Sequence, residues 1–251
     1  MSGAVSNPAL KISSVTKSFG PLKVLTDVSI TVERGERRLI LGPNGAGKTT
    51  LFNVVAGAMK PSSGSISIDG EDVSSLSSSG RSRLGLSRTF QIITLFDRDT
   101  LEQNVALALL GHLPLRWDMF AGKRALDALR SEARGVLQQI GLLNLAERRV
   151  ASCSYGEKRR VEIALALASK PRILLLDEPL AGLSPEERET VKALLASIPS
   201  DTAVVMIEHD MDVALALAER ITVLHYGNVI AEGTKDDVLA DPRTQEVYLG
   251  S

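Results

Sequence analysis

One stretch constrains this chain more than any other. Residues 42–50 read GPNGAGKTT, which fits the spacing G-x-x-x-x-G-K-[ST] of a phosphate-binding loop. Glycines in such a loop let several backbone N–H groups approach the oxygens of a polyphosphate, and a larger side chain would obstruct that approach. Lys48 can reach the β- and γ-phosphates, and the Thr49 hydroxyl can bind Mg²⁺. The residues assigned to this site are Gly42, Pro43, Asn44, Gly45, Ala46, Gly47, Lys48, Thr49 and Thr50.

The flanking sequence has the form that the motif requires. Residues 39–41 are apolar and predict a short buried strand that enters the loop. Residues 49–59 predict a helix that leaves the loop, with its N-terminus directed at the anion. The alternative is a glycine-rich turn that matches by chance, and the order of strand, loop and helix argues against it. The loop is therefore interpreted as a nucleotide site.

Two further apolar runs end in polar residues that suit phosphate chemistry. Residues 173–176 (ILLL) predict a strand buried on both faces, which places Asp177 at its end as a Mg²⁺ ligand. Glu178 follows and would face a water in line with the γ-phosphate. His209 ends the run at residues 203–207 in the same manner and is expected to contact the γ-phosphate. The alternatives are ordinary surface acids and a structural histidine.

Composition limits the partners and the compartment. The formal net charge of −1 argues against nucleic acid, because binding to a phosphate backbone usually needs a basic face. No apolar run approaches the length of a membrane span, and residues 1–10 lack a secretory pattern. The single cysteine, Cys153, excludes an internal disulfide and suits a reducing compartment. We expect a soluble, cytoplasmic protein that meets a membrane only through a partner.

The order of elements predicts a mostly parallel sheet with helices on both sides. Strands are expected at residues 10–19, 24–32 and 65–68, and a core strand at 85–91. Helices are expected at residues 101–110, 123–140, 154–169 and 185–198, the last with Ser184 as N-cap and Pro185 in its first turn. We expect one domain over residues 10–251, with a helical subdomain inserted at about 92–153 and a tail at about 235–251.

Taken together, these motifs resemble those of ABC-transporter ATPases in order and spacing, over nearly the whole chain. They are the phosphate loop, Gln91, the segment 153–157, residues 173–178, residues 181–184 and His209. The resemblance implies an α/β fold of the P-loop NTPase class: a RecA-like, mostly parallel sheet core, an N-terminal antiparallel β subdomain and an inserted α-helical subdomain. It also implies ATP hydrolysis with Mg²⁺.

In that family two ATPase subunits face head to tail, and each ATP lies between the phosphate loop of one and the signature segment of the other. The usual signature is Leu-Ser-Gly-Gly-Gln, from which residues 153–157 (CSYGE) depart at three of five positions. Ser154 and Gly156 remain, and they supply a hydroxyl, an unobstructed amide and a helix N-terminus to the opposing γ-phosphate.

The resemblance assigns further roles. Gln91 contacts Mg²⁺ or the attacking water and signals to the membrane subunits. Phe19 matches the aromatic residue that stacks on adenine, although a core aromatic at a strand end is the alternative. Residues 181–184 (AGLS) match the loop that touches its twin across the dimer.

Three segments look like those of the branched-chain amino acid importer ATPases, in particular the larger of the two related subunits. These are residues 87–91 (SRTFQ), the segment 154–164 (SYGEKRRVEIA) and the tail at 241–250, and the long helical insertion is a further similarity. The implied partners are a second ATPase subunit (a copy or a paralogue), two membrane permease subunits and, indirectly, a periplasmic solute-binding protein. The protein would then lie peripherally on the inner face of the cell membrane.

Alternatives remain within and beyond this branch. Urea, amide or aromatic-acid importers and the ATPase of lipopolysaccharide export stay open. A soluble ABC ATPase of DNA repair or translation usually carries a coiled-coil insertion or two cassettes, and neither is present. A kinase would need a substrate lid, and a GTPase an Asn-Lys-x-Asp motif; neither is found.

The segment 92–120 is expected to serve docking. It follows Gln91 directly and is rich in apolar residues with few charges. An exposed apolar patch usually marks a protein interface. In the family a cleft beside this segment receives a short helix of the membrane subunit, so Leu95, Phe96 and Asp97 are expected to border that cleft.

Overall fold

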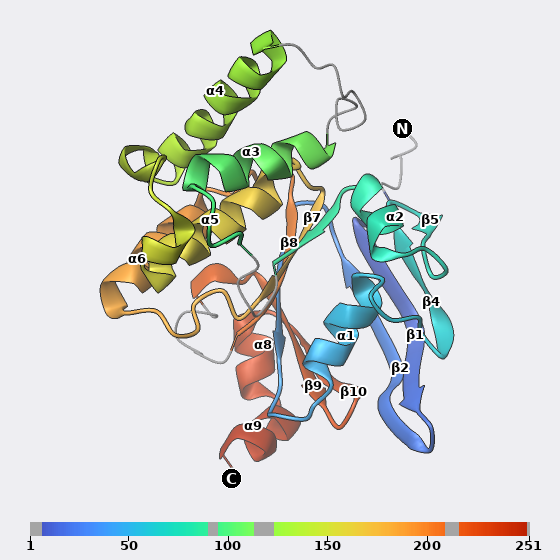
Figure 1. Cartoon of the computed structure of the whole chain (residues 1–251). Coiled ribbons are helices and arrows are strands. Elements are labelled where there is room, and N and C mark those ends of the chain that lie inside the picture. Colours follow the sequence, from blue (N-terminus) through green and yellow to red (C-terminus); the bar gives the residue numbers. More distant parts are fainter. Residues whose placement is uncertain (1–6, 90–94, 113–122, 209–215, 250–251) are drawn as a thin grey trace, which may run out of the picture. The chain divides into compact units, whose positions relative to one another are not determined.

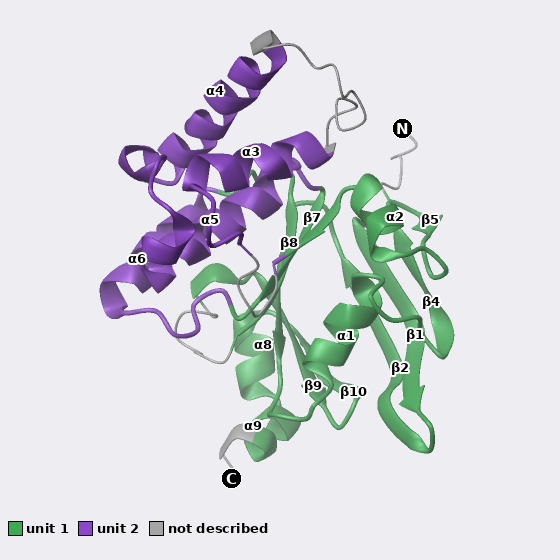
Figure 2. Ribbon diagram, in the orientation of Figure 1, with its two compact units in different colours: residues 1–88, 172–178, 198–251 green, residues 89–171, 179–197 purple. Residues whose placement is uncertain are grey.

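The structure is a computed structural model that describes residues 7–89, 95–112, 123–208 and 216–249. The chain divides into two compact units, coloured separately in Figure 2. Unit 1 comprises Met1–Arg88, Arg172–Glu178 and Ile198–Ser251, and unit 2 comprises Thr89–Pro171 and Pro179–Ser197. Unit 1 holds both sheets, whereas unit 2 is helical. Gln91 and His209, both expected site residues, lie outside the described residues.

The centre of unit 1 is a six-stranded sheet in the order β10-β9-β3-β8-β7-β6. All neighbours in it pair in parallel except β9 and β10, which form an antiparallel hairpin. This confirms the mostly parallel sheet. The strands are β3 (Arg37–Leu41), β6 (Leu86–Arg88), β7 (Ile173–Asp177), β8 (Ala203–Ile207), β9 (Arg220–His225) and β10 (Asn228–Gly233).

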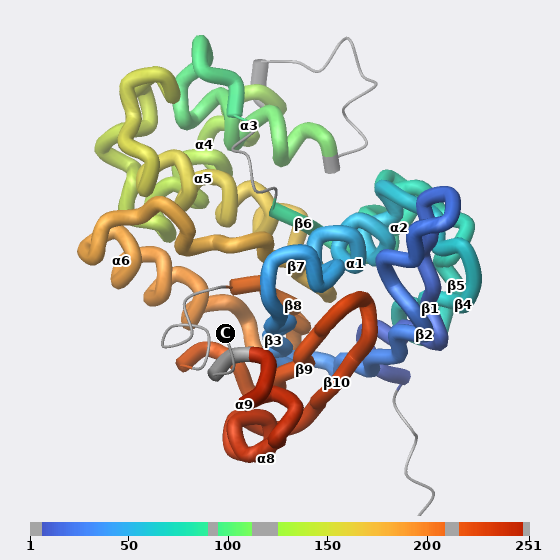
Figure 3. The backbone as a smooth tube through the Cα atoms, turned by 90° about the horizontal axis from the view of Figure 1, so that it is seen from below, coloured from blue at the N-terminus to red at the C-terminus, as the bar shows by residue number. Residues whose placement is uncertain are grey.

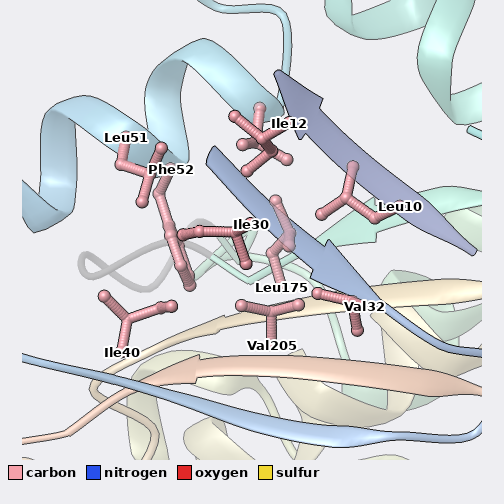
Figure 4. Close-up of a pocket in the computed structure, with 10 residues that line it drawn as sticks. Leu10, Ile12, Ile30, Val32, Ile40, Leu51, Phe52, Leu175 and Val205 are labelled. Atoms are coloured by element: carbon pink, nitrogen blue, oxygen red, sulfur yellow. The ribbon is translucent and has the colours of Figure 1, made fainter. Parts of the chain in front are cut away.

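A second, four-stranded antiparallel sheet has the order β2-β1-β4-β5, which confirms the N-terminal antiparallel β subdomain. Its strands are β1 (Leu10–Phe19), β2 (Leu22–Val32), β4 (Ser63–Ile68) and β5 (Glu71–Asp72). Helix α1 (Lys48–Val55) lies between this sheet and the parallel sheet (Figure 1). Figure 4 shows its Phe52 among side chains from both sheets. They leave a void of about 10 Å³, which is close to the least space that a water molecule needs.

Two expected elements differ from the structure. The segment 85–91 is predicted to be a core strand, but β6 spans only Leu86–Arg88 and lies at the edge of the sheet, with residues 90 and 91 outside the described residues. Leu86 is buried, whereas Ser87 and Arg88 are partly buried, because an edge strand has a neighbouring strand on one side alone. The helix after the phosphate loop ends at Val55 instead of Met59. Gly57 stops it with a left-handed φ of 75°, as glycine commonly does just after a helix C-terminus.

Unit 2 is built from helices around its own apolar core. They are α3 (Leu101–His112), α4 (Lys123–Gln139), α5 (Tyr155–Ala168) and α6 (Pro185–Ala196), with short 3₁₀ turns at Leu143–Leu145 and Val150–Ser152. The apolar stripe of α4, with Leu129, Ala133 and Leu137, packs into this core as its helical spacing predicts. The unit includes the expected insertion at 92–153 and also takes in α5 and α6.

The remaining helices belong to unit 1. The short α2 (Ser78–Arg83) follows β5, and α8 (Lys235–Ala240) and α9 (Pro242–Leu249) form the C-terminal part of the chain. Helix α8 packs beside β9 and β10, as Figure 3 also shows. Within the described parts of the chain, no helix has the length and apolar character that a membrane span requires.

Candidate functional site

The phosphate loop connects β3 to α1 and is packed against two other segments of unit 1. A Cβ at position 42 would collide with the carbonyl oxygen of Leu224 at the end of β9. A Cβ at position 47 would crowd the Val24 carbonyl and the Leu25 side chain of β2. The Gly227 amide donates to the Ala46 carbonyl at 3.0 Å, which ties the β9–β10 turn to the loop. Gly42 and Gly47 are therefore required by the packing of the protein itself.

Gly45 is required for a different reason. It has a left-handed φ of 79°, and a Cβ there would meet no atom within 4 Å. The motif requires glycine at positions 42 and 47 and leaves position 45 open to any residue, yet of these three glycines only Gly45 has open space in front of its backbone. This open space is where an anion can approach the loop.

Lys48 is positioned by the loop that it serves. Its side chain is buried, with 6% exposed, and Nζ donates to the Gly42 carbonyl at 2.6 Å and the Pro43 carbonyl at 3.0 Å. Burial lowers the pKa of Lys48, although Glu178 and Asp177 favour its charged form. Such a buried ammonium group, held by neutral carbonyls, suits a polyanion as its stronger partner.

The start of α1 supports the same interpretation. No side chain caps this helix at Gly47. By contrast α5, α6 and α8 each begin with a capping box, in which an N-cap hydroxyl and a carboxylate three residues later satisfy the first amides. The uncapped first turn of α1 points its positive dipole end toward the loop, which favours phosphate. Thr49 is exposed in this first turn.

Asp177 ends β7 as predicted and is 1% exposed. Its Oδ2 forms an ion pair with Arg88 Nη2 at 3.0 Å, and Arg88 Nη1 donates to Asn53 Oδ1 of α1 at 2.7 Å. The Arg88 guanidinium also lies 5.8 Å from the ring centroid of Phe52. Sequence reasoning missed Arg88 because nothing in its own segment indicates a distant carboxylate.

Glu178 follows Asp177 at a sharp change of chain direction. Its φ is 48°, uncommon for a residue with a side chain, and its amide donates to the Ile207 carbonyl of β8 at 3.0 Å. The two carboxylates thus lie at the carboxyl end of β7, beside the end of its parallel neighbour β8, at the edge where open α/β sheets bind ligands. Such unusual backbone conformations are concentrated at functional sites.

Phe19 lies at the end of β1 and is 46% exposed, so it is not a core aromatic residue. Lys17 Nζ lies 5.1 Å from its ring centroid. An exposed aromatic ring with a cation near its face offers a stacking platform. The core alternative for Phe19 is therefore wrong, and adenine stacking stays a prediction.

In unit 2 the expected signature segment forms the start of α5. Ser154 is its N-cap: Oγ accepts from the Glu157 amide at 3.1 Å, and Glu157 Oε2 accepts from the Ser154 amide at 2.7 Å. The exposed Tyr155 lies beside Gly182, whose added Cβ would lie 3.4 Å from the tyrosine ring. The segment 153–157 and the loop 181–184 are thus neighbours within unit 2.

Gly156 has a partner that sequence reasoning missed. Oε1 of Glu187, in the first turn of α6, accepts from the Gly156 amide at 3.1 Å and from Ser154 Oγ at 3.0 Å. A Cβ at position 156 would collide with this carboxylate. Glu187 could have been found only through the packing of α5 on α6.

The expected docking residues are placed differently from one another. Leu95 packs partly into the core of unit 2, whereas Phe96 is 61% exposed. Asp97 forms a 3.4 Å ion pair with Lys158. The backbone of Phe96 is fixed by Asn104, which accepts from its amide at 2.8 Å and donates to its carbonyl at 3.2 Å. The apolar residues of the segment 92–120 at 92, 93, 113, 117, 119 and 120 lie outside the described residues.

The donors present fit Mg²⁺ as part of a nucleotide complex. The described residues contain no cluster of three or more His, Cys, Asp or Glu side chains suited to a metal ion. Asp177 and Thr49 offer one carboxylate and one hydroxyl, both oxygen donors of the kind that Mg²⁺ prefers. Phosphate oxygens and water would have to complete its six ligands.

Comparison with known proteins agrees with this geometry. Residues 25–181 match the family model described as ABC transporter. The chain is 36% identical to the high-affinity branched-chain amino acid transport ATP-binding protein BraF of Pseudomonas aeruginosa, over 98% of this chain and 99% of that protein. It is 35% identical to the lipopolysaccharide export system ATP-binding protein LptB of Haemophilus influenzae, over 96% and 97% of the two chains.

Solved structures share the fold. The ADP conformation of MJ1267, an ATP-binding cassette of an ABC transporter, superposes with a TM-score of 0.83 at 29% identity, over 97% of this chain and 99% of that one. The ATP-binding cassette MJ0796, a dimeric structure of a post-hydrolysis state bound to ADP and Pi, gives a TM-score of 0.76 at 29% identity, over 90% and 98%.

Proposed function

The chain belongs to the ABC transporter family of ATP-binding proteins and is one of its ATPases, and from this premise we propose that it energises uptake of branched-chain amino acids or related small polar solutes. The observation that carries the solute class is the 36% identity to BraF over nearly the full length of both chains. The segments at 87–91 and 158–164 support the same branch.

Binding of the ATP phosphates and of Mg²⁺ is assigned to the phosphate loop, α1 and the end of β7. The amides around Gly45 and the first turn of α1 bind the phosphates, and Lys48 exchanges its two carbonyl partners for β- and γ-phosphate oxygens. Thr49 and Asp177 would hold Mg²⁺, with Gln91 as a further ligand. When bound, Mg²⁺ neutralises charge on the β- and γ-phosphates.

The attacking water needs a base and an orienting group. Glu178 takes the role of the base, because it is the carboxylate that directly follows the Mg²⁺ ligand Asp177 at the carboxyl end of β7. Proton transfer to Glu178 generates the nucleophile while Lys48 stabilises the negative charge of the transferring group. Gln91 and His209 are proposed to contact the water or Mg²⁺ and the γ-phosphate. Phe19 is proposed to stack on adenine.

We propose a head-to-tail dimer with a copy or a paralogue, in which Ser154 and Gly156 bind the γ-phosphate of the ATP on the opposite subunit. The dimeric cassette MJ0796 supports dimer formation. Two membrane permease subunits would bind at the segment 92–120, with a periplasmic solute-binding protein on the far side. The subunit would then act on the inner face of the cell membrane, and no nucleic acid is involved.

The test is reconstitution. The protein is expressed with two permease subunits of a branched-chain amino acid importer from the same organism, purified as a complex and placed in proteoliposomes with the corresponding binding protein. We expect leucine-stimulated ATP hydrolysis and ATP-dependent leucine transport, both lost in a Glu178→Gln complex. Stimulation by urea or amides instead of leucine would reassign the solute.

Lipopolysaccharide export is the second candidate, because LptB is 35% identical over nearly the full chain. The same preparation distinguishes it. An exporter ATPase would copurify with its permeases yet ignore every binding protein and amino acid. A protein that purifies without any permease and hydrolyses ATP alone would contradict both transport roles.

A further inference from the structure

One carboxylate in unit 2 joins the starts of two helices. Glu187 Oε2 accepts from the Ser184 amide at 3.1 Å and so completes the capping box of its own helix α6. Its other oxygen, Oε1, extends to α5 and accepts from the Gly156 amide at 3.1 Å and from the Ser154 hydroxyl at 3.0 Å. The two groups assigned to the γ-phosphate thus already bind an anion from the same chain.

The chemistry at Oε1 matches that of a phosphate oxygen. Both are anionic oxygens that accept from a hydroxyl and from a helix-start amide, at the positive end of the helix dipole. Gly156 is required for this approach, because a Cβ there would collide with the Glu187 carboxylate. One oxygen cannot accept from this hydroxyl and this amide while a γ-phosphate occupies the same two donors.

We propose that Glu187 occupies the signature groups in the ATP-free subunit and must be displaced by the γ-phosphate, so that it sets the ATP concentration at which two subunits associate. This inference rests on the proposed head-to-tail dimer. Glu187 acts through Ser154 and Gly156 and is a positioning residue. The device keeps the donors of α5 satisfied and oriented until a more highly charged anion arrives.

The carboxylate is released by competition and not by protonation. The Ser184 amide, together with Ser154 and the Gly156 amide, lowers the pKa of Glu187, so it is ionised throughout the physiological pH range. Displacement therefore requires an anion of higher charge, such as the terminal phosphate of ATP. ADP, which lacks the γ-phosphate, leaves the contact intact. Closure would thus distinguish ATP from ADP at the signature segment as well as at Lys48.

The experiment uses the full-length chain with Glu178→Gln, which blocks turnover, and follows ATP-dependent dimerisation by analytical ultracentrifugation. Glu187→Gln keeps the length of the side chain and its capping role but removes the charge. Glu187→Asp keeps the charge but shortens the reach to α5. The matched control is Glu186→Gln, because Glu186 lies in the same turn and contacts Ser184 Oγ at 3.1 Å instead of the signature groups.

We expect the ATP concentration at half-maximal dimerisation to be lower by about threefold or more in both Glu187 variants than in the Glu178→Gln parent. A change of this size is what the loss of one competing hydrogen-bonded contact would produce. The Glu186 control should match its parent. An unchanged or higher midpoint in both Glu187 variants would show that Glu187 only joins α5 to α6 and would overturn the inference alone. A parent that stays monomeric at saturating ATP would overturn the proposed dimer, and the inference with it.

Discussion

Arg88 Nη2 and Asp177 Oδ2 lie 3.0 Å apart in an ion pair whose side chains are only 8% and 2% exposed. The pair joins the edge strand β6 to its neighbour β7, and Asn53 connects it to α1. Asp177 is the proposed Mg²⁺ ligand, so Arg88 supplies positive charge to this carboxylate in the ATP-free protein. A buried carboxylate would otherwise carry a large desolvation cost.

Arg88→Met should therefore destabilise the ATP-free protein by about 3 kcal/mol, because it leaves Asp177 with much less compensation. Mg²⁺ and ATP together should recover part of the loss, since the divalent cation restores positive charge at Asp177. Thermal unfolding with and without both ligands measures this. The control is Arg83→Met, which removes an exposed arginine that donates to Ser79 within its own helix α2. Equal losses in the two variants would contradict the role assigned to Arg88.

Glu178→Gln should bind ATP normally but hydrolyse it about 100- to 10,000-fold more slowly, because the water loses its base while the phosphate loop stays intact. An ATP-bound dimer should accumulate. Phosphate release and gel filtration in ATP measure the two effects. Turnover within a few-fold of the parent would rule out Glu178 as the base. Glu189→Gln is a suitable control, because Glu189 is an exposed glutamate on α6.

Lys48→Ala should lose ATP affinity by about tenfold or more together with turnover, because a charge-assisted contact to the phosphates is removed. Equilibrium binding of a fluorescent ATP analogue measures the affinity. Lys60→Ala serves as control, since Lys60 lies beyond α1 at the surface. If the affinity of the Lys48 variant equals that of the control, the lysine does not contact the phosphates.

Substitution of alanine for Gly42 and for Gly45 should have different effects on folding stability. Gly42→Ala should reduce folding stability as well as ATP binding, because its Cβ collides with the Leu224 carbonyl. Gly45→Ala should cost only about 1 kcal/mol of folding stability, for its left-handed backbone, but should strongly weaken ATP binding. Thermal unfolding and ATP titration of both variants measure this. Equal stability losses would refute the distinction.

The exposed Phe96 should mark the permease-docking surface, because Asn104 fixes its backbone while its ring is 61% exposed. In a Cys153→Ser background, a cysteine introduced at Phe96 should crosslink to a cysteine in a cytoplasmic permease loop, and nucleotide should alter the yield. A cysteine introduced at the exposed Lys60, outside the segment 92–120, is the control and should not crosslink. An assembled, active complex in which no loop position crosslinks to residue 96 would place docking elsewhere.

Elements whose signals are local could be predicted well from the sequence. The apolar run at 173–176 became β7, and Ser184 and Pro185 start α6 as N-cap and in its first turn. These features depend on neighbours a few residues apart, so their physical chemistry is contained in one segment. The predicted end of a helix was wrong where a single residue decided it: Gly57 ends α1 at Val55, four residues before the predicted Met59.

The sequence by itself determined the phosphate loop, the adjacent carboxylates and the start of the signature helix, because each needs only a short run of suitable residues. Only the tertiary structure decided which distant side chain meets each of them. Arg88 reaches Asp177 across 89 positions, and Glu187 reaches Gly156 across 31. Such pairs depend on how strands and helices pack. The sequence around a charged residue does not indicate which distant carboxylate or amide will lie beside it in the folded protein.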